Sequence, residues 1–172
     1  MDWIGLVNAL ASVATAVGVL LAGWQIRLAK QASRSQFEDS LTQQYREIIK
    51  KIPIEALLGE DLKTLEPQKW ENTLDDFYRY IDLSNEQVFL RQNNRVSKAT
   101  WRLWSEGIKL KLELKSFKDA WEHFKREAPE SFKELQLIEL KDNFKSDPRE
   151  WGTNWEEQLR SLKAKSGKQL DR

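Results

Sequence analysis

An uncharged run from Trp3 to Ile26 constrains this chain more than any other feature of its sequence. About 20 predominantly apolar residues in a helix suffice to cross the hydrocarbon core of a bilayer. At 1.5 Å per residue, Trp3 and Trp24 are about 31 Å apart along a helix, which suits aromatic residues at the two membrane interfaces. The run predicts a transmembrane anchor over residues 1–27, with the lipid bilayer as a partner. The alternative is a helix buried in the core of a small domain.

The charges that flank this run predict its orientation. Asp2 precedes it and no Lys or Arg does, whereas Arg27, Lys30 and Arg34 follow it before the first acidic residue, Glu38. A cleaved signal peptide begins with a basic region, which is missing here. By the positive-inside rule, the N-terminus lies outside and the rest of the chain lies in the cytoplasm. We expect a single-pass membrane protein whose C-terminal domain is cytoplasmic.

One face of the predicted span consists of small residues. Ala14, Gly18 and Ala22 recur at every fourth position, and Gly5 and Ala9 repeat that spacing. Such faces let transmembrane helices approach closely and associate. We therefore expect a homo-oligomer formed through Ala14, Gly18 and Ala22. The alternative is that Ala and Gly are simply common in membrane helices.

The rest of the chain has helical periodicity, and the predicted fold class is all-α. Residues 28–52 form a juxtamembrane amphipathic helix, 53–163 a small cytosolic helical domain, and 164–172 a polar tail. The apolar stripe of the juxtamembrane helix consists of Phe37, Leu41, Tyr45, Ile48 and Ile52. A stripe of this kind packs on the rest of the domain or on copies of itself.

Turn and capping residues divide the domain into helices. Residues 54–58 are expected to form a short helix between Pro53 and Gly59. Pro67 starts a long helix because proline is favoured in a first turn, Ser97 caps the next helix, and Ser116 is expected to cap a third. The alternating stretch 109–115, "KLKLELK", is the one place where a strand competes. Its helical neighbours favour a helix end followed by a turn.

Catalytic motifs are absent from the sequence. The chain has no cysteine and one histidine, His123, so a thiolate nucleophile, a zinc site and a histidine-centred triad are not expected. The net charge of +1 does not favour DNA as a partner. We expect no enzyme activity, no catalytic residues, no cofactor and no metal.

The concentrated polar chemistry lies in residues 89–104, "FLRQNNRVSKATWRLW". If the preceding helix runs through residue 92, Arg91 and Arg95 face the same way, and Lys98 and Arg102 repeat that spacing on the next helix. Cations for phosphates, with amides and tryptophan rings for bases, are typical of nucleotide recognition. The alternative is a polar, solvent-exposed turn between two helices, with both tryptophans in the core. The candidate ligand-binding residues are Arg91, Gln92, Asn93, Asn94, Arg95, Lys98 and Arg102.

Two resemblances bear on function. The segment "FYRYIDLSNEQVFLRQNNRVSKATWRLWSEGIK", followed by "FKDAW", resembles a group of small bacterial single-span membrane-anchored helical proteins of uncharacterised function, over roughly residues 3–125. The architecture is also similar to that of the cyclic-oligoadenylate-responsive membrane effectors of type III CRISPR antiviral defence. That likeness is one of architecture and carries no binding residues over.

These observations lead to two functional hypotheses. In the first, the chain is an oligomeric effector in antiphage defence, whose cytosolic domain senses a cyclic oligonucleotide at the 91–102 corner and transmits binding to the membrane. In the second, it is a membrane-anchored adaptor without ligand or catalytic activity, whose stripe from Phe37 to Ile52 recruits a partner helix.

Overall fold

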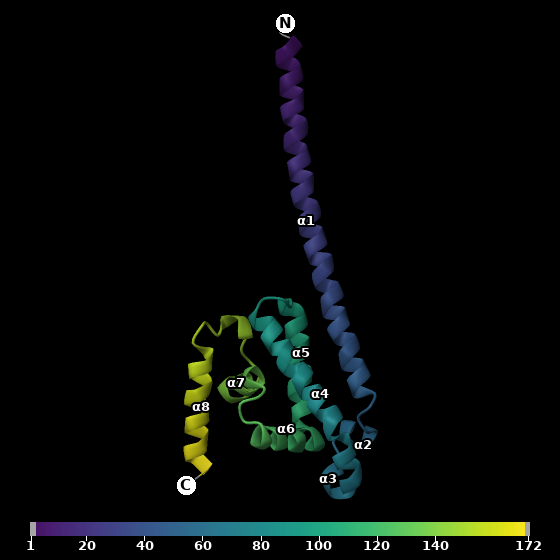
Figure 1. Ribbon diagram of the computed structural model, residues 1–172, viewed down its shortest axis with the longest axis vertical. Helices are drawn as coiled ribbons and strands as arrows, with labels where there is room; N and C mark the ends of the chain where they lie inside the picture. The colour runs from purple at the N-terminus through teal and green to yellow at the C-terminus, as the bar shows by residue number, and fades with distance from the viewer. Residues whose placement is uncertain (1–2, 171–172) are drawn as a thin grey trace. The chain divides into compact units, whose positions relative to one another are not determined.

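The computed structural model describes residues 3–170, and all regular structure within them is helical, as predicted (Figure 1). Within residues 3–170, eight α-helices and one short 3-10 helix, η1, follow one another. Their bounds are α1 Trp3–Ile49, α2 Ile54–Leu57, α3 Leu62–Leu65, α4 Pro67–Gln92, α5 Lys98–Glu113, α6 Lys115–Glu127, α7 Lys133–Asp142, η1 Pro148–Glu150 and α8 Trp155–Leu170.

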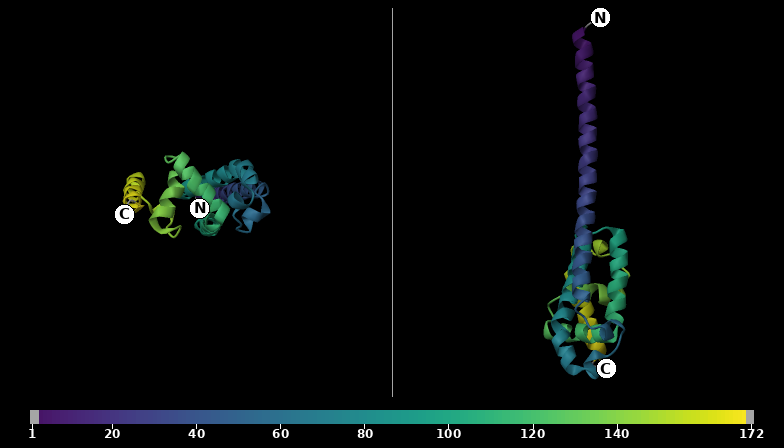
Figure 2. Two further views of the ribbon diagram at one scale, coloured as in Figure 1. Left: turned by 90° about the horizontal axis from the view of Figure 1, so that it is seen from below. Right: turned by 90° about the vertical axis from the view of Figure 1, so that its right-hand side faces the viewer.

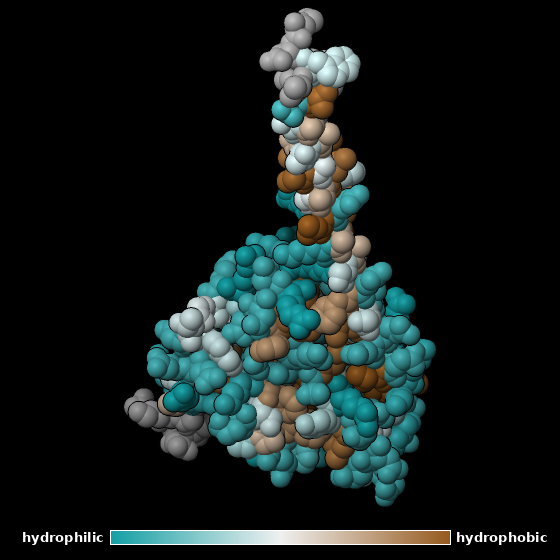
Figure 3. All heavy atoms as spheres, turned by 45° about the horizontal axis from the view of Figure 1, so that its top comes forward, coloured by the Kyte–Doolittle hydropathy of each residue, from teal (hydrophilic) through white to brown (hydrophobic). Residues whose placement is uncertain are grey.

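The chain divides into two compact units, Met1–Ser40 and Leu41–Arg172. The first is the N-terminal part of α1, which is long and apolar enough to cross a membrane, and none of its apolar window is buried. Val13 is 62% exposed, Leu20 74% and Trp24 60%. Figure 3 shows apolar residues of this part of α1 lying open on its surface. Such exposure of large apolar side chains is characteristic of a surface that something else covers.

The second unit is a helical domain built around α4. This helix contacts α3, α5, α6, α7 and η1. Phe77 and Tyr80 of α4 meet the ring of Phe117 from α6 edge-on, at centroid distances of 5.0 and 5.1 Å. The last helix, α8, packs beside α7 at one edge of the domain (Figures 1 and 2). The aromatic core therefore lies where α4 and α6 meet.

Four predicted features of the helices are confirmed. Pro67 occupies the first turn of α4. Ser97 caps α5, and its hydroxyl accepts a hydrogen bond of 3.1 Å from the Thr100 N–H. The stretch 109–115 contains the end of α5 and the start of α6, with no strand. The short helix after Pro53 is present as α2.

The prediction for Ser116 was wrong. Helix α6 starts at Lys115, and Ser116 lies inside it, fully buried. Its hydroxyl donates to the Glu60 carbonyl at 2.6 Å and accepts from the Leu62 N–H at 3.0 Å. A buried serine must satisfy its hydroxyl, and here the partners come from the loop and helix before α4 rather than from its own helix.

The ends of α1 and α8 differ from the predicted bounds. Helix α1 ends at Ile49, ahead of Pro53, while α8 continues to Leu170 and so includes most of the predicted polar tail. Within the domain, Leu41 and Ile52 are only 2% and 4% exposed. This part of the apolar stripe is therefore buried in the protein itself.

Candidate functional site

The amide-rich turn after α4 is a helix C-cap. Asn94 adopts the left-handed conformation, with φ 56°, which asparagine tolerates better than most residues. The Arg95 N–H donates to the Leu90 carbonyl at 2.9 Å, and the Asn94 N–H donates to the Arg91 carbonyl at 3.0 Å. These two bonds form a Schellman motif. The Asn93 side chain adds a bond of 2.8 Å to the Phe89 carbonyl. The asparagines thus end the helix.

Arg91 is a structural residue of this corner. Its side chain is 4% exposed, and its guanidinium pairs bidentately with Asp147, with Nε to Oδ1 at 2.8 Å and Nη2 to Oδ2 at 2.5 Å. Nη1 donates to the Val96 carbonyl at 2.9 Å. Bidentate arginine–carboxylate pairs are strong and geometrically specific. This pair ties the end of α4 to the turn after it and to the residue that precedes η1.

The ionisation of Asp147 fits this role. Burial opposes its negative charge, but the hydrogen bonds from Arg91 and the Arg149 N–H, with the charges of Arg91 and Lys98, outweigh burial and lower its pKa below the ordinary value. The carboxylate is therefore charged at neutral pH and satisfies the buried guanidinium.

The other predicted ligand residues are only partly brought together. Helix α4 ends at Gln92, so Arg95 lies in the turn and does not share a face with Arg91; that geometric prediction was wrong. Arg95, Lys98 and Arg102 are exposed, as are Asn93 and Asn94, and Gln92 is half-buried. Ligand binding by these residues stays a prediction.

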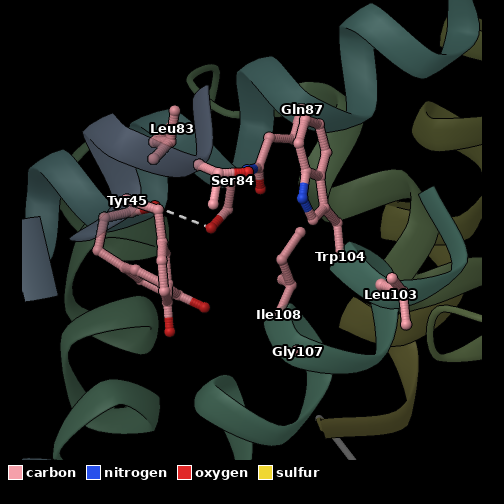
Figure 4. Close-up of a pocket in the computed structure, with 10 residues that line it drawn as sticks. Tyr45, Leu83, Ser84, Gln87, Leu103, Trp104, Gly107 and Ile108 are labelled. Carbon is pink, nitrogen blue, oxygen red and sulfur yellow. Dashed lines mark hydrogen bonds between the residues drawn. The ribbon is translucent and has the colours of Figure 1, made fainter. Parts of the chain in front are cut away.

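The two tryptophans of the segment have different environments. Trp101 is 4% exposed and belongs to the core. Trp104 is half-buried and forms one wall of a cavity of about 240 Å³ inside the helical domain (Figure 4). The residues that line this cavity are Thr42, Tyr45, Tyr80, Leu83, Ser84, Gln87, Leu103, Trp104, Gly107 and Ile108.

Three helices supply these residues at helical spacing. The end of α1 contributes positions 42 and 45, α4 contributes 80, 83, 84 and 87, and α5 contributes 103, 104, 107 and 108. Residues three or four apart lie on one face of a helix, so each helix turns one stripe toward the cavity. A Cβ built on Gly107 would meet nothing within 4 Å. The space beside this glycine is therefore open.

Tyr45 lies opposite Trp104 in the cavity (Figure 4), and Tyr80 also lines it. The rings of Tyr45 and Tyr80 are 6.3 Å apart and tilted by 58°. Burial raises the pKa of both phenols, so both are neutral at physiological pH. The Ser84 hydroxyl donates to the Tyr80 carbonyl of its own helix at 2.8 Å. The serine is therefore already satisfied.

Gln87 is a polar residue of the cavity whose amide forms no hydrogen bond with the described part of the chain. It is 5% exposed and it lines the cavity. The buried side chains of Thr73, Ser84, Arg91, Ser105, Ser116 and Gln136 all form hydrogen bonds. Within residues 3–170, no hydrogen bond joins the Gln87 amide to another residue. The Gln87 amide atoms are not fully buried as the unpaired Trp121 Nε1 is, so they keep solvent contact and can bond a ligand or water in the cavity.

The chemistry available at the cavity is binding chemistry. None of its lining residues carries a charge at neutral pH. Among the residues that the structure describes, no group of three His, Cys, Asp or Glu side chains could hold a metal ion. His123 lies elsewhere, with its ring 5.3 Å from that of Phe124.

The sequence did contain a signal for this site, in the polar residues on the buried face of α4. Ser84 and Gln87 follow Tyr80 at positions four and seven along an otherwise apolar stripe, where leucine or valine would fill a core. A polar residue on such a face must find a partner, and the partner can be a ligand.

The predicted oligomerisation face lies in the first unit. Ala14, Gly18 and Ala22 are exposed, and a Cβ on Gly18 would meet nothing within 4 Å. Self-association through this face stays a prediction.

Comparison with known proteins gives no match: no family model, no curated protein and no solved structure is similar to this chain. The resemblance to anchored bacterial proteins and the likeness to antiviral effectors therefore stay predictions, and the functional argument depends on the cavity.

Proposed function

We propose that this protein is a single-span membrane protein whose helical domain senses a small molecule in the cavity between α1, α4 and α5. The N-terminus lies outside the bacterial inner membrane and the domain lies in the cytoplasm. The protein binds its ligand and does not transform it. The unpartnered Gln87 amide in an otherwise neutral, aromatic cavity is the observation that carries the proposal.

The membrane assignment is supported by the exposed apolar surface of α1 before Ser40. In water, the exposed side chains of Val13, Leu20 and Trp24 would be solvated. Solvation of apolar surface is unfavourable by about 25 cal/mol per Å² relative to a lipid environment. Arg27, Lys30 and Arg34 follow the apolar run and favour a cytoplasmic location for what comes after it.

The sensing assignment is supported by the position of the cavity along the chain. Thr42 and Tyr45 line it, and both belong to α1, the helix that also contains the apolar run. A ligand that fits one arrangement of Tyr45 better than another shifts the population of that arrangement. Binding in the domain thereby acts on the membrane-anchored helix.

Topology is tested with single cysteines, because the natural chain has none. Asp2→Cys and Thr153→Cys are expressed separately and treated with a membrane-impermeant maleimide in intact and lysed spheroplasts. We expect Asp2→Cys to react in intact spheroplasts and Thr153→Cys only after lysis. Extraction of both variants by alkaline carbonate, or reaction of Thr153→Cys in intact spheroplasts, would refute the assignment.

Sensing is tested with the full-length protein in detergent micelles. The protein is exposed to a protein-free extract of bacterial metabolites, washed and denatured, and the released small molecules are identified by mass spectrometry. Gly107→Phe places a ring at the open side of the cavity, and Gly107→Ala is the matched control that adds only a methyl group. We expect a compound to be retained by the wild type and Gly107→Ala and lost with Gly107→Phe. Equal retention by all three, or by none, would show that the cavity is not a sensing site.

A further inference from the structure

The charge of the lining restricts the ligand first. The cavity offers aliphatic, hydroxyl, amide and aromatic groups and no cation or carboxylate. Arg91 lies one turn beyond Gln87 on α4, but its guanidinium is held by Asp147 and the Val96 carbonyl. An ionised ligand would lose its hydration without gaining a counter-charge. The geometry therefore selects an uncharged molecule.

The walls restrict its shape. Figure 4 shows Tyr45 on one side of the cavity and the indole of Trp104 on the other, with Ile108 near the indole. Aromatic rings contact other rings favourably when they are offset or edge-on. The cavity has a volume of about 240 Å³. A small ring system fits in this space.

Gln87 restricts the polar groups of the ligand. Its amide presents an acceptor and a donor side by side in one plane. A ligand satisfies both when it has a donor and an acceptor on adjacent atoms, as in the pair that glutamine forms with an adenine edge. An apolar ligand would displace solvent from the Gln87 amide without replacing its hydrogen bonds.

We propose that the cavity binds one small, uncharged, planar heteroaromatic molecule that pairs an adjacent donor and acceptor with the Gln87 amide and lies between Trp104 and Tyr45. Lactams and free nucleobases have this chemistry. The proposal rests on the proposed function, for which this cavity is the sensing site.

The test uses probes that differ in one feature. 2-Quinolone has an N–H next to a carbonyl, 1-methyl-2-quinolone lacks that N–H, and quinoline-2-carboxylate is planar but charged. Adenine tests a purine edge. Binding to the full-length protein in detergent micelles is measured by saturation-transfer NMR and titration, with empty micelles and Gly107→Phe as blanks.

We expect 2-quinolone or adenine to bind, methylation to weaken quinolone binding about tenfold or more, and the carboxylate not to bind. Gln87→Leu removes the amide and keeps an apolar side chain of similar length. The Gln87→Leu variant should bind 2-quinolone only as weakly as the wild type binds 1-methyl-2-quinolone. Its thermal stability should not be lower than that of the wild type. A merely structural glutamine would instead lower stability when replaced.

Three results would overturn the proposal. They are no binding by 2-quinolone or adenine, equal binding of 2-quinolone and its methyl derivative, and binding unaffected by Gln87→Leu. None of these three results changes the interpretation of the metabolite-extract experiment that tests the proposed function. If that experiment yields a charged or non-planar compound that Gly107→Phe excludes, the sensing function stands and this ligand class is wrong.

Discussion

Removal of the Asp147 carboxylate should destabilise the helical domain strongly, because it leaves the buried Arg91 guanidinium without its partner. The side chains of the pair are 4% and 12% exposed, and two bonds join them. Breaking a buried ion pair from one side costs about 3–5 kcal/mol. Asp147 retains some contact with solvent, so we expect Asp147→Ala to lower the free energy of unfolding by about 2–3 kcal/mol.

The assay is urea unfolding of the full-length protein in detergent, followed by tryptophan fluorescence. Asp75→Ala is the matched control, because Asp75 forms a bond of the same kind, at 2.9 Å, with Arg79 on the surface. Those two side chains are 72% and 57% exposed, and exposed pairs contribute little. The control should unfold like the wild type.

The pH dependence follows from the lowered pKa of Asp147. A carboxyl whose pKa is lower in the folded state stabilises the fold fully above its ordinary pKa of 3.8, and this contribution is lost as the pH falls through the lowered value. The difference in the free energy of unfolding between the wild type and Asp147→Asn should therefore decrease below about pH 4. If Asp147→Ala is as stable as Asp75→Ala at pH 7, Arg91 is not held as described.

This result also decides how the predicted anion site can be tested. A charge reversal at Arg91 would damage the fold, so loss of ligand binding by that variant would be uninformative. Reversal at Lys98 and Arg102, both exposed, tests phosphate binding without touching the buried pair.

Two further variants examine other parts of the fold by the same unfolding assay. Ser116→Ala removes the buried hydroxyl that joins α6 to Glu60 and should cost about 1–3 kcal/mol; Ser105→Ala, whose hydroxyl bonds only its own helix, should change little, and equal effects would contradict the bridging role. At the left-handed Asn94, alanine should be less stable than glycine by about 1 kcal/mol, and the opposite order would argue against the Schellman motif.

Local signals in the sequence were sufficient for the helices. Pro67 and Ser97 act on the first turn of their own helices, so their effects do not depend on the rest of the fold. The prediction that Ser116 caps a helix failed because its hydrogen-bond partners, the Glu60 carbonyl and the Leu62 N–H, are more than 50 residues away in the sequence. A hydroxyl near a helix start looks the same in sequence whether it caps that helix or bonds another element.

The sequence by itself determined that the chain is all-α and that it has an apolar helix followed by basic residues, since periodicity and charge are properties of contiguous residues. Only the tertiary structure decided what the polar residues of α4 do. The sequence could not show that Arg91 pairs with Asp147, 56 positions later, at 2.8 Å. Gln87 was one polar residue among many until α1 and α5 enclosed it. The physical reason is the same for both: the free energy of a buried polar group depends on its partners, and those partners come from distant parts of the chain.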